Sequence, residues 1–218
     1  GYPNTSTIEV LTIASKGNAT KFGNTLGEGH NIASTSNHVR AIGGGGNVTS
    51  VVSTIQYITM ASDGNATYFG DLSLGRSGAN ACSSRTRSVI SGGNDGTNPR
   101  VNTMDYVEIA TTGNAIDFGD ATYKDARCSG QVSSRTRGIL MRTGSADATM
   151  DFITIASTGN AQEFGEDTIA ALGASCSSET RGINMAGEGT NSISYITIAT
   201  TGNSIDFGDV FSQGGGGG

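Results

Sequence analysis

The fold of this chain is decided by the stretch YITMASDGNATYFGD, which spans residues 57–71. Related copies recur along the chain, and their five Gly-Asn pairs start at Gly17, Gly64, Gly113, Gly159 and Gly202. Successive pairs lie about 46 residues apart, a period typical of small units that stack in a row or surround an axis. The sequence therefore predicts a repeat protein, and no set of its residues has the pattern of a catalytic site.

Each copy has two halves with different sequence signatures. The first half is a run of β-branched and aromatic residues, such as residues 55–60, which is typical of a strand. The Gly-Asn pair follows, and both residue types tolerate the positive φ that a tight hairpin needs. A second short strand then ends in Phe-Gly. The second half carries Ser-Ser-x-Thr-Arg, as at residues 83–87, and predicts a loop followed by a strand that ends at glycines. Each unit is expected to hold three or four strands and no helix.

The chain is expected to form a single repeat domain over residues 1–218. The predicted repeats are 7–52, 53–101, 102–149, 150–192 and 193–213, with a glycine tail at 214–218. The last repeat is incomplete, because the chain has five first halves and only four second halves. Three explanations are open: a fragment of a longer protein, an imperfectly closed ring, or terminal glycines that stand for unidentified residues.

Composition and charge bear on the classes of partner. The chain has 34 glycines, no tryptophan and a net charge of −6, with no run of lysine and arginine. Nucleic acid is therefore not expected as a partner, because phosphate binding needs a basic face. No apolar stretch approaches the roughly 20 residues of a spanning helix, so membrane insertion is not expected. No cofactor is expected.

Cysteine and histidine are too scattered to predict a bridge or a metal centre. Cys82 and Cys176 occupy the same repeat position in different units, where disulfide geometry is out of reach, and free thiols are predicted there and at Cys128. His30 and His38 both lie in the first repeat and are interpreted as loop residues rather than metal ligands.

The chain resembles the kelch-type β-propeller family. The resemblance rests on Gly92-Gly93 at the end of a strand, on Tyr106 in the next strand, on the Gly113-Asn114 turn, and on Phe118 in place of the family's usual tryptophan. It implies an all-β fold, a β-propeller of about five kelch-like blades. The alternative is an elongated β-repeat fibre module.

A second resemblance is to repeat proteins in the virions of bacteriophages that infect aquatic bacteria. It is carried by tandem units such as residues 195–209, and by the Ser-Ser-x-Thr-Arg-Gly motif. It implies a non-enzymatic virion component of the tail, fibre or capsid surface, with other virion proteins and a bacterial surface glycan as partners, and a homo-oligomer as one form. The location implied is the virion or extracellular space. The alternatives are a lectin-like propeller outside a virion and a glycan-degrading enzyme. Recognition is expected in the connectors 93–101 and 142–149, since loops on a rigid scaffold carry specificity.

Three residue types recur at fixed repeat positions. The phenylalanines are interpreted as core residues, with a ligand-stacking set as the alternative. The arginines and carboxylates predict ion pairs between strands or sheets, with an anion site around a central channel as the alternative for the arginines. These positions are Phe22, Phe69, Phe118, Phe164 and Phe207; Arg40, Arg87, Arg137 and Arg181; and Asp71, Asp120, Glu166 and Asp209.

Two chemical alternatives attach to the carboxylates. Asp117 with Asp120, and Asp206 with Asp209, have a spacing that suits part of a calcium site, although no loop supplies a full ligand set. Paired acids also raise the possibility of glycoside hydrolysis, which needs two carboxyl groups at a set separation. Because these acids recur with the scaffold and form no singular pair, catalytic residues and metal ligands are not predicted.

Overall fold

The fold is all-β, built from antiparallel sheets, in a computed structural model that describes residues 5–125, 130–141, 148–168, 174–185 and 190–211. No segment of these described residues forms a long apolar helix of the kind that crosses a membrane. The predicted thiol at Cys128, the glycine tail and most of the 142–149 connector lie outside the described residues.

The strands form one two-stranded sheet and four four-stranded sheets. The half-sheet is β1 (Thr7–Val10) and β2 (Thr20–Asn24). Sheet I is β3 (Ala33–Ser36), β4 (Arg40–Gly44), β5 (Thr54–Thr59) and β6 (Thr67–Asp71). Sheet II is β7 (Asn80–Ser83), β8 (Arg87–Ser91), β9 (Val101–Glu108) and β10 (Ile116–Asp125). Sheet III is β11 (Val132–Ser133), β12 (Arg137–Met141), β13 (Thr149–Thr154) and β14 (Gln162–Glu166). Sheet IV is β15 (Ala174–Ser177), β16 (Arg181–Met185), β17 (Ser192–Thr197) and β18 (Ile205–Asp209).

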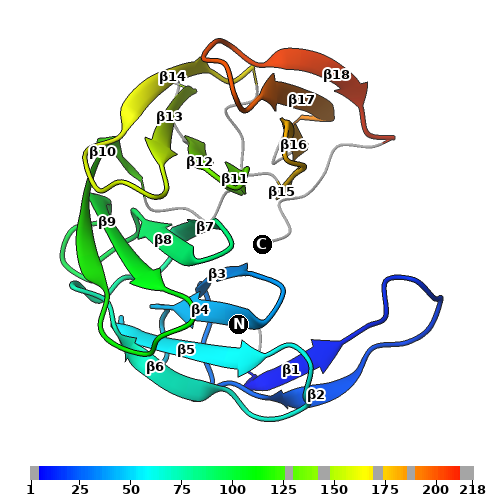
Figure 1. The fold of residues 1–218 in the computed structure, drawn as a ribbon, viewed down its shortest axis with the longest axis vertical. Coiled ribbons are helices and arrows are strands. Elements are labelled where there is room, and N and C mark those ends of the chain that lie inside the picture. The colour runs from blue at the N-terminus through cyan, green and yellow to red at the C-terminus, as the bar shows by residue number, and fades with distance from the viewer. Residues whose placement is uncertain (1–4, 126–129, 142–147, 169–173, 186–189, 212–218) are drawn as a thin grey trace.

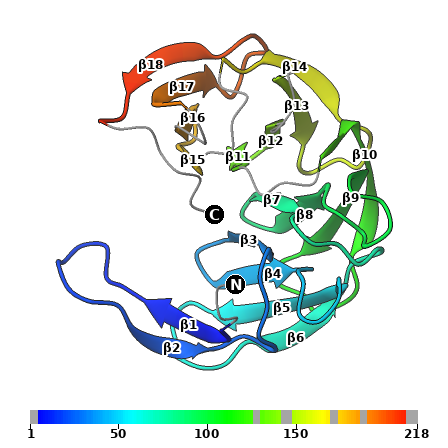
Figure 2. The same cartoon turned by 180° about the vertical axis from the view of Figure 1, so that it is seen from behind.

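The sheets lie side by side in an arc (Figure 1). In every four-stranded sheet the first strand lies near the centre and the fourth lies on the rim, as the view from behind also shows (Figure 2). The arc is open between the half-sheet and sheet IV. Each complete sheet joins the second half of one sequence repeat to the first half of the next, so the sheets are offset by half a repeat from the sequence units.

The Phe-Gly sequence marks a β-bulge in the last strand of every sheet. In sheet II, Asp117 faces Asp105 and Gly119 faces Met104, so Phe118 is the extra residue without a partner on β9. The same shift skips the phenylalanine in the other four sheets. A bulge turns its extra residue away from the regular alternation of the strand. In this way each sheet directs one phenylalanine toward its neighbour.

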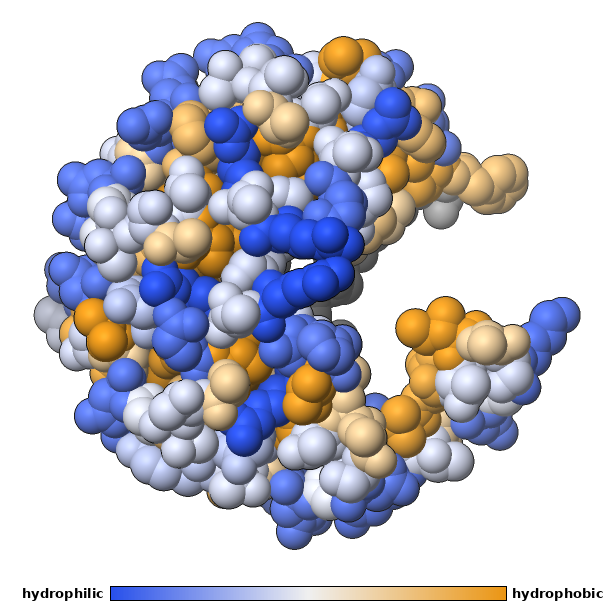
Figure 3. Space-filling view, viewed as in Figure 1, coloured by the Kyte–Doolittle hydropathy of each residue, from blue (hydrophilic) through white to orange (hydrophobic). Residues whose placement is uncertain are grey.

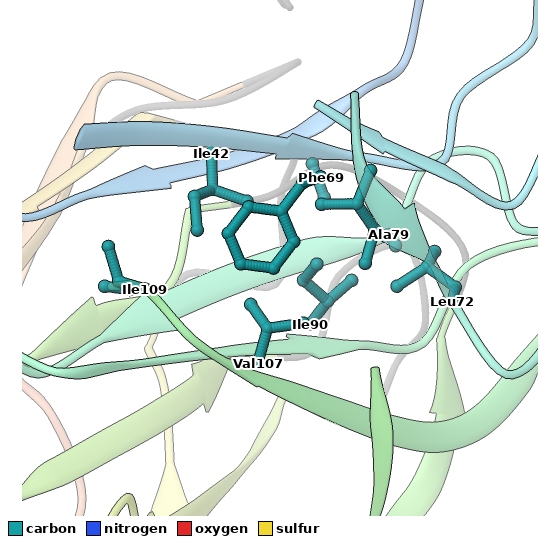
Figure 4. Packing of buried hydrophobic residues seen from close by; sticks show 9 residues of the cluster. Ile42, Phe69, Leu72, Ala79, Ile90, Val107 and Ile109 are labelled. Carbon is teal, nitrogen blue, oxygen red and sulfur yellow. The ribbon is translucent and has the colours of Figure 1, made fainter. Parts of the chain in front are cut away.

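Separate hydrophobic cores fill the spaces between consecutive four-stranded sheets. Between sheets I and II, Ile42 and Phe69 pack against Ile90, Val107 and Ile109 of the next sheet (Figure 4). Equivalent cores surround Phe118 between sheets II and III, and Phe164 between sheets III and IV. Phe69, Phe118, Phe164 and Phe207 also each meet an aromatic ring of their own sheet edge to face, with centroids 5.8–6.4 Å apart.

The prediction of phenylalanine cores is confirmed at four positions and wrong at the fifth. Phe22, Phe69, Phe118 and Phe164 are buried, and each has a following sheet. Phe207 is 52% exposed, because no described sheet follows sheet IV in the arc. The environment of an identical residue is therefore set by its neighbouring sheet.

Candidate functional site

Consecutive sheets are joined by a recurring backbone contact. At the contact of sheets II and III, the N–H of Gly159 donates to the carbonyl oxygen of Phe118 at 2.7 Å, and the N–H of Ala161 donates to that of Asp120 at 2.9 Å. The N–H of Asp120 donates in return to Oδ1 of Asn160 at 3.0 Å. Equivalent bonds occur at all four contacts between consecutive sheets. The Gly-Asn turn of one sheet therefore binds the Phe-Gly pair and the residue after it in the preceding sheet.

This contact corrects the predicted role of the asparagine in the Gly-Asn pair, whereas the glycine has the expected positive φ at Gly113, Gly159 and Gly202. Asn31 is the one non-glycine residue with positive φ among the described residues, so the turn asparagines serve as side-chain acceptors and not as left-handed turn residues. The residue after phenylalanine has to be glycine, because the turn of the next sheet leaves no room for a Cβ atom. A Cβ on Gly70 would lie 2.1 Å from the carbonyl oxygen of Gly113, and one on Gly23 would lie 1.9 Å from that of Gly64.

The recurring arginines join sheets through carbonyl oxygens. Arg137 Nη1 donates to the carbonyl oxygens of Ile198 and Ala199 in sheet IV, both at 3.0 Å, while its guanidinium lies 4.3 Å from the centre of the Phe152 ring. Arg40 and Arg87 likewise donate to carbonyl oxygens of the sheet that follows, and each guanidinium lies over an aromatic ring of its own sheet, Tyr57 for Arg40 and Tyr106 for Arg87. A guanidinium over an aromatic face keeps its charge partly neutralised while its N–H groups donate elsewhere.

The predicted ion pairs between these arginines and the carboxylates after Phe-Gly are wrong. The carboxylate of Asp71 accepts from the hydroxyl of Ser53 at 3.0 Å and from Tyr68 at 2.5 Å. This bond to Asp71 is the main reason that the pKa of Tyr68 is raised. Within the described residues, Arg87 alone of the four arginines has an ionic partner, which is Glu108 on the neighbouring strand at 2.8 Å. The acids contribute backbone groups to the sheet contacts, and that role does not require a charge.

A buried ion pair that the sequence did not predict lies between sheets I and II. Arg76 and Asp105 are 2.7 Å apart, and both side chains are fully buried. Arg76 also donates to the carbonyl oxygen of Thr103 at 2.6 Å, and Asp105 accepts from the hydroxyl of Ser73 at 2.6 Å. Burial lowers the pKa of Arg76, and the charge of Asp105 opposes that shift. Arg76 stands outside the repeat pattern, so periodicity could not reveal this pair.

A polar cavity of about 550 Å³ lies where the loops between the first two strands of the four sheets meet. Hydrophilic residues gather at the centre of the arc (Figure 3). We call this cavity the axial pocket. Its lining residues are Ser36, Asn37, His38, Ser83, Ser84, Arg85, Ser133, Ser134, Arg135 and Glu179.

The Ser-Ser-x-Thr-Arg motif shapes the axial pocket. The second serine of the motif closes a turn. Ser84 Oγ accepts from the N–H of Arg87 at 3.1 Å, and the N–H of Ser84 donates to the carbonyl oxygen of Arg87 at 2.9 Å. Ser134 and Ser178 form the same turn in the next two sheets. The residue between serine and threonine, such as Arg85, therefore lies at the pocket wall in each sheet.

Hydroxyl groups of the first serine link these loops around the axis. Ser83 Oγ donates to the carbonyl oxygen of Ser36, Ser133 Oγ to that of Ser83, and Ser177 Oγ to that of Ser133, each at 3.0 Å. This ladder holds neighbouring loops at a fixed separation, so the pocket wall is organised by the scaffold.

The charges on the axial pocket are mostly positive. Arg135 pairs with Glu179 at 2.7 Å, and both side chains are more than half exposed. Arg85 has no ionic partner within the described part of the chain. The alternative interpretation placed Arg40, Arg87, Arg137 and Arg181 around a central channel, but the pocket is lined by Arg85 and Arg135. The Ser-Ser-x-Thr-Arg motif did mark these loops in the sequence. The arginines that line the pocket occupy its variable position x, and the recurring arginine at its last position does not line the pocket.

The other candidate features have simpler accounts. In the connector 93–101, Asp95 accepts from Asn98 and Thr97, and its bond with the Asn98 side chain is the main reason that its pKa is lowered. Cys82 and Cys176 are free thiols, as predicted. No group of three or more His, Cys, Asp or Glu residues in the described ranges is arranged to hold a metal ion, Asp117 with Asp120 included.

No protein-family model and no curated protein matches this chain.

Proposed function

We propose that this chain is a kelch-like β-propeller module and a non-enzymatic structural component of a bacteriophage virion. In this proposal it occupies the tail, fibre or capsid surface, and its axial pocket binds an acidic glycan of the host surface. The virion assignment is supported by the resemblance of the repeats to those of phage proteins. The glycan assignment rests on the axial pocket.

The arrangement of the sheets favours a propeller over a straight fibre. Their first strands gather at the centre of the arc and their fourth strands lie on the rim (Figure 1). Radially arranged four-stranded antiparallel sheets are the defining feature of propellers. With four complete sheets and one half-sheet, the proposed propeller has about five blades, two strands short in the described chain.

The observation that carries the proposed binding function is the composition of the axial pocket. The hydroxyl oxygens of Ser84 and Ser134 accept hydrogen bonds within their turns, which leaves their O–H groups able to donate to a sugar, and His38 adds a further polar group to the pocket wall. The guanidinium of Arg85, together with that of Arg135, suits a carboxylate or sulfate group, because charge-assisted hydrogen bonds are the stronger ones. Loops from different sheets present these groups on a rigid scaffold, as binding sites commonly do.

The test is binding of the purified chain to sulfated and uronic-acid oligosaccharides, with neutral oligosaccharides of equal length as the reference. Arg85→Ala should weaken binding of the acidic sugars by about 10-fold or more, since a hydrogen bond to a charged group contributes about 1.5–3 kcal/mol. Lys124→Ala is the matched control, because it removes one positive charge from the exposed rim strand β10.

Two results would contradict the proposed binding function. One is equal binding of acidic and neutral sugars, and the other is an equal loss of affinity in Arg85→Ala and Lys124→Ala. The virion assignment is tested separately, by mass spectrometry of purified phage particles from aquatic bacteria. Peptides of this chain should copurify with intact particles, and their confinement to the particle-free fraction would contradict the assignment.

A further inference from the structure

The two ends of the arc carry the two complementary halves of the contact that joins the sheets within it. Sheet IV ends in Phe207, Gly208 and Asp209, which are equivalent to the segment that binds a following Gly-Asn turn. The half-sheet begins the arc and carries the turn Gly17-Asn18-Ala19, which is equivalent to the turn that binds a preceding sheet. Within the described chain, neither half has an occupant.

One face of sheet IV is exposed, whereas the equivalent face of the earlier sheets is covered by the sheet that follows. Cys176 is exposed, whereas Cys82 at the same repeat position is buried. A Cβ built on Gly208 would meet no atom within 4 Å, whereas one on Gly119 would lie 2.6 Å from the carbonyl oxygen of Gly159. We call the surface formed by Cys176, Arg181 and residues 207–209 the open face.

The hairpin of the half-sheet, residues 10–20, shows the matching exposure. Ile13 is 96% exposed, whereas Ile155 at the equivalent position is fully buried beneath the preceding sheet. Leu11 is 62% exposed, whereas Ile153 is 3% exposed. Hydrophobic residues are visible on this projecting hairpin at the open end of the arc (Figure 3). We call residues 10–20 the leading hairpin.

We infer that the open face of one copy of this chain binds the leading hairpin of a second copy. The internal contacts specify the bonds that this association makes. The N–H groups of Gly17 and Ala19 donate to the carbonyl oxygens of Phe207 and Asp209. The N–H of Asp209 donates to Oδ1 of Asn18, in the pattern seen at the other four contacts.

Arg181 adds a further bond to this association. Its guanidinium lies 4.4 Å from the centre of the Tyr195 ring, the same arrangement that Arg137 has with Phe152. Arg137 donates to carbonyl oxygens of the following sheet, at the positions equivalent to Ile13 and Ala14 in the leading hairpin. Docking of the leading hairpin supplies Arg181 with these acceptors and covers Phe207 and Ile13.

A second copy is the occupant that fits the arrangement of the arc. The leading hairpin and the open face lie on opposite sides of the opening in both views, so a chain cannot join its own ends without moving its sheets (Figures 1 and 2). A second copy can dock without such movement. The contact is head to tail, and such contacts produce closed rings or filaments.

The test is the mass of the purified chain in solution, measured by light scattering over roughly a hundredfold range of concentration. The unmodified chain should form species heavier than the 22.1 kDa monomer as concentration rises. Ile13→Glu on the leading hairpin and Phe207→Glu on the open face should each remain monomeric. Ile116→Glu is the control, because Ile116 is 58% exposed on β10 and belongs to neither surface.

A mixing experiment tests the head-to-tail geometry. Ile13→Glu keeps its open face and Phe207→Glu keeps its leading hairpin, so equal amounts of the two variants should form a dimer and nothing larger. A mixture that remains monomeric would overturn the inference. Asn18→Ala is a milder variant that should weaken association, and Asn160→Ala, its equivalent inside the arc, should lower stability without changing the mass.

An unmodified chain that is monomeric at every concentration overturns the inference, whether its open face stays unoccupied or is covered by closure within one chain.

Discussion

The buried pair of Arg76 and Asp105 gives the sharpest test of how the sheets are held together. Replacing Asp105 with alanine removes the partner of a guanidinium that is fully buried and 2.7 Å away. It also removes the acceptor of the Ser73 hydroxyl. Because a lone charge is left in the interior, the free energy of unfolding should fall by about 3–5 kcal/mol.

The assay is thermal and urea unfolding followed by circular dichroism. For a chain of this length, each kcal/mol shifts the melting temperature by about 2–4 °C, so Asp105→Ala should lower it by about 6–20 °C. Glu108→Ala is the matched control, because Glu108 pairs with Arg87 at 2.8 Å while remaining 47% exposed. An exposed pair of this kind contributes about 0–1 kcal/mol.

A double variant separates burial of charge from loss of contacts. Arg76→Met combined with Asp105→Leu leaves no charge in the interior, and replacement of a buried pair by apolar groups is often neutral or stabilising. The double variant should therefore be more stable than Asp105→Ala alone. If Asp105→Ala proves no more destabilising than Glu108→Ala, then water reaches the Arg76 guanidinium and the account of a dry pair is refuted.

Four further predictions concern residues at repeat positions. Phe118→Ala should lower the free energy of unfolding by about 3–5 kcal/mol, and Phe207→Ala by much less, because only Phe118 is in a closed core; equal losses in urea unfolding would contradict this. In dilute protein, iodoacetamide should modify Cys176 and spare Cys82, since burial raises the pKa of Cys82 to about 12, and peptide mapping gives the result. Stability should fall as pH rises above the ordinary thiol pKa of about 8.5, because the unfolded state then loses a proton that folded Cys82 retains, whereas Cys82→Ala should show a smaller fall. Asn160→Ala should cost about 0.5–1.5 kcal/mol through the lost acceptor for the Asp120 N–H, and an unchanged melting temperature would contradict that bond.

Strand content and hairpin order could be predicted from the sequence because they depend on local signals. The β-branched runs of residues 55–60 and their equivalents became the third strands of the sheets, and the Phe-Gly segments became the fourth strands. The sequence also shows that the chain has five first halves of the repeat and only four second halves. This imbalance appears in the structure as four complete sheets and one half-sheet.

The partners of the recurring polar residues could not be predicted in the same way. Spacing suggested that arginines and carboxylates meet, because the two types recur together. The register of the strands instead places Arg137 over Phe152 and beside the carbonyl oxygens of the next sheet. The axial pocket was missed for a related reason, since its charged residues occupy the position that varies between repeats.

Local sequence sets the repeat, the strands and the positions of the turns, because these depend on side-chain preference and backbone geometry over a few residues. Tertiary structure alone decided what each repeated residue does. Phe118 and Phe207, or Cys82 and Cys176, occupy equivalent positions, yet one of each pair is buried and the other is exposed. The physical reason is that burial, hydrogen bonding and ionisation in this chain depend on whether a neighbouring sheet covers the residue, and that is a property of the arc.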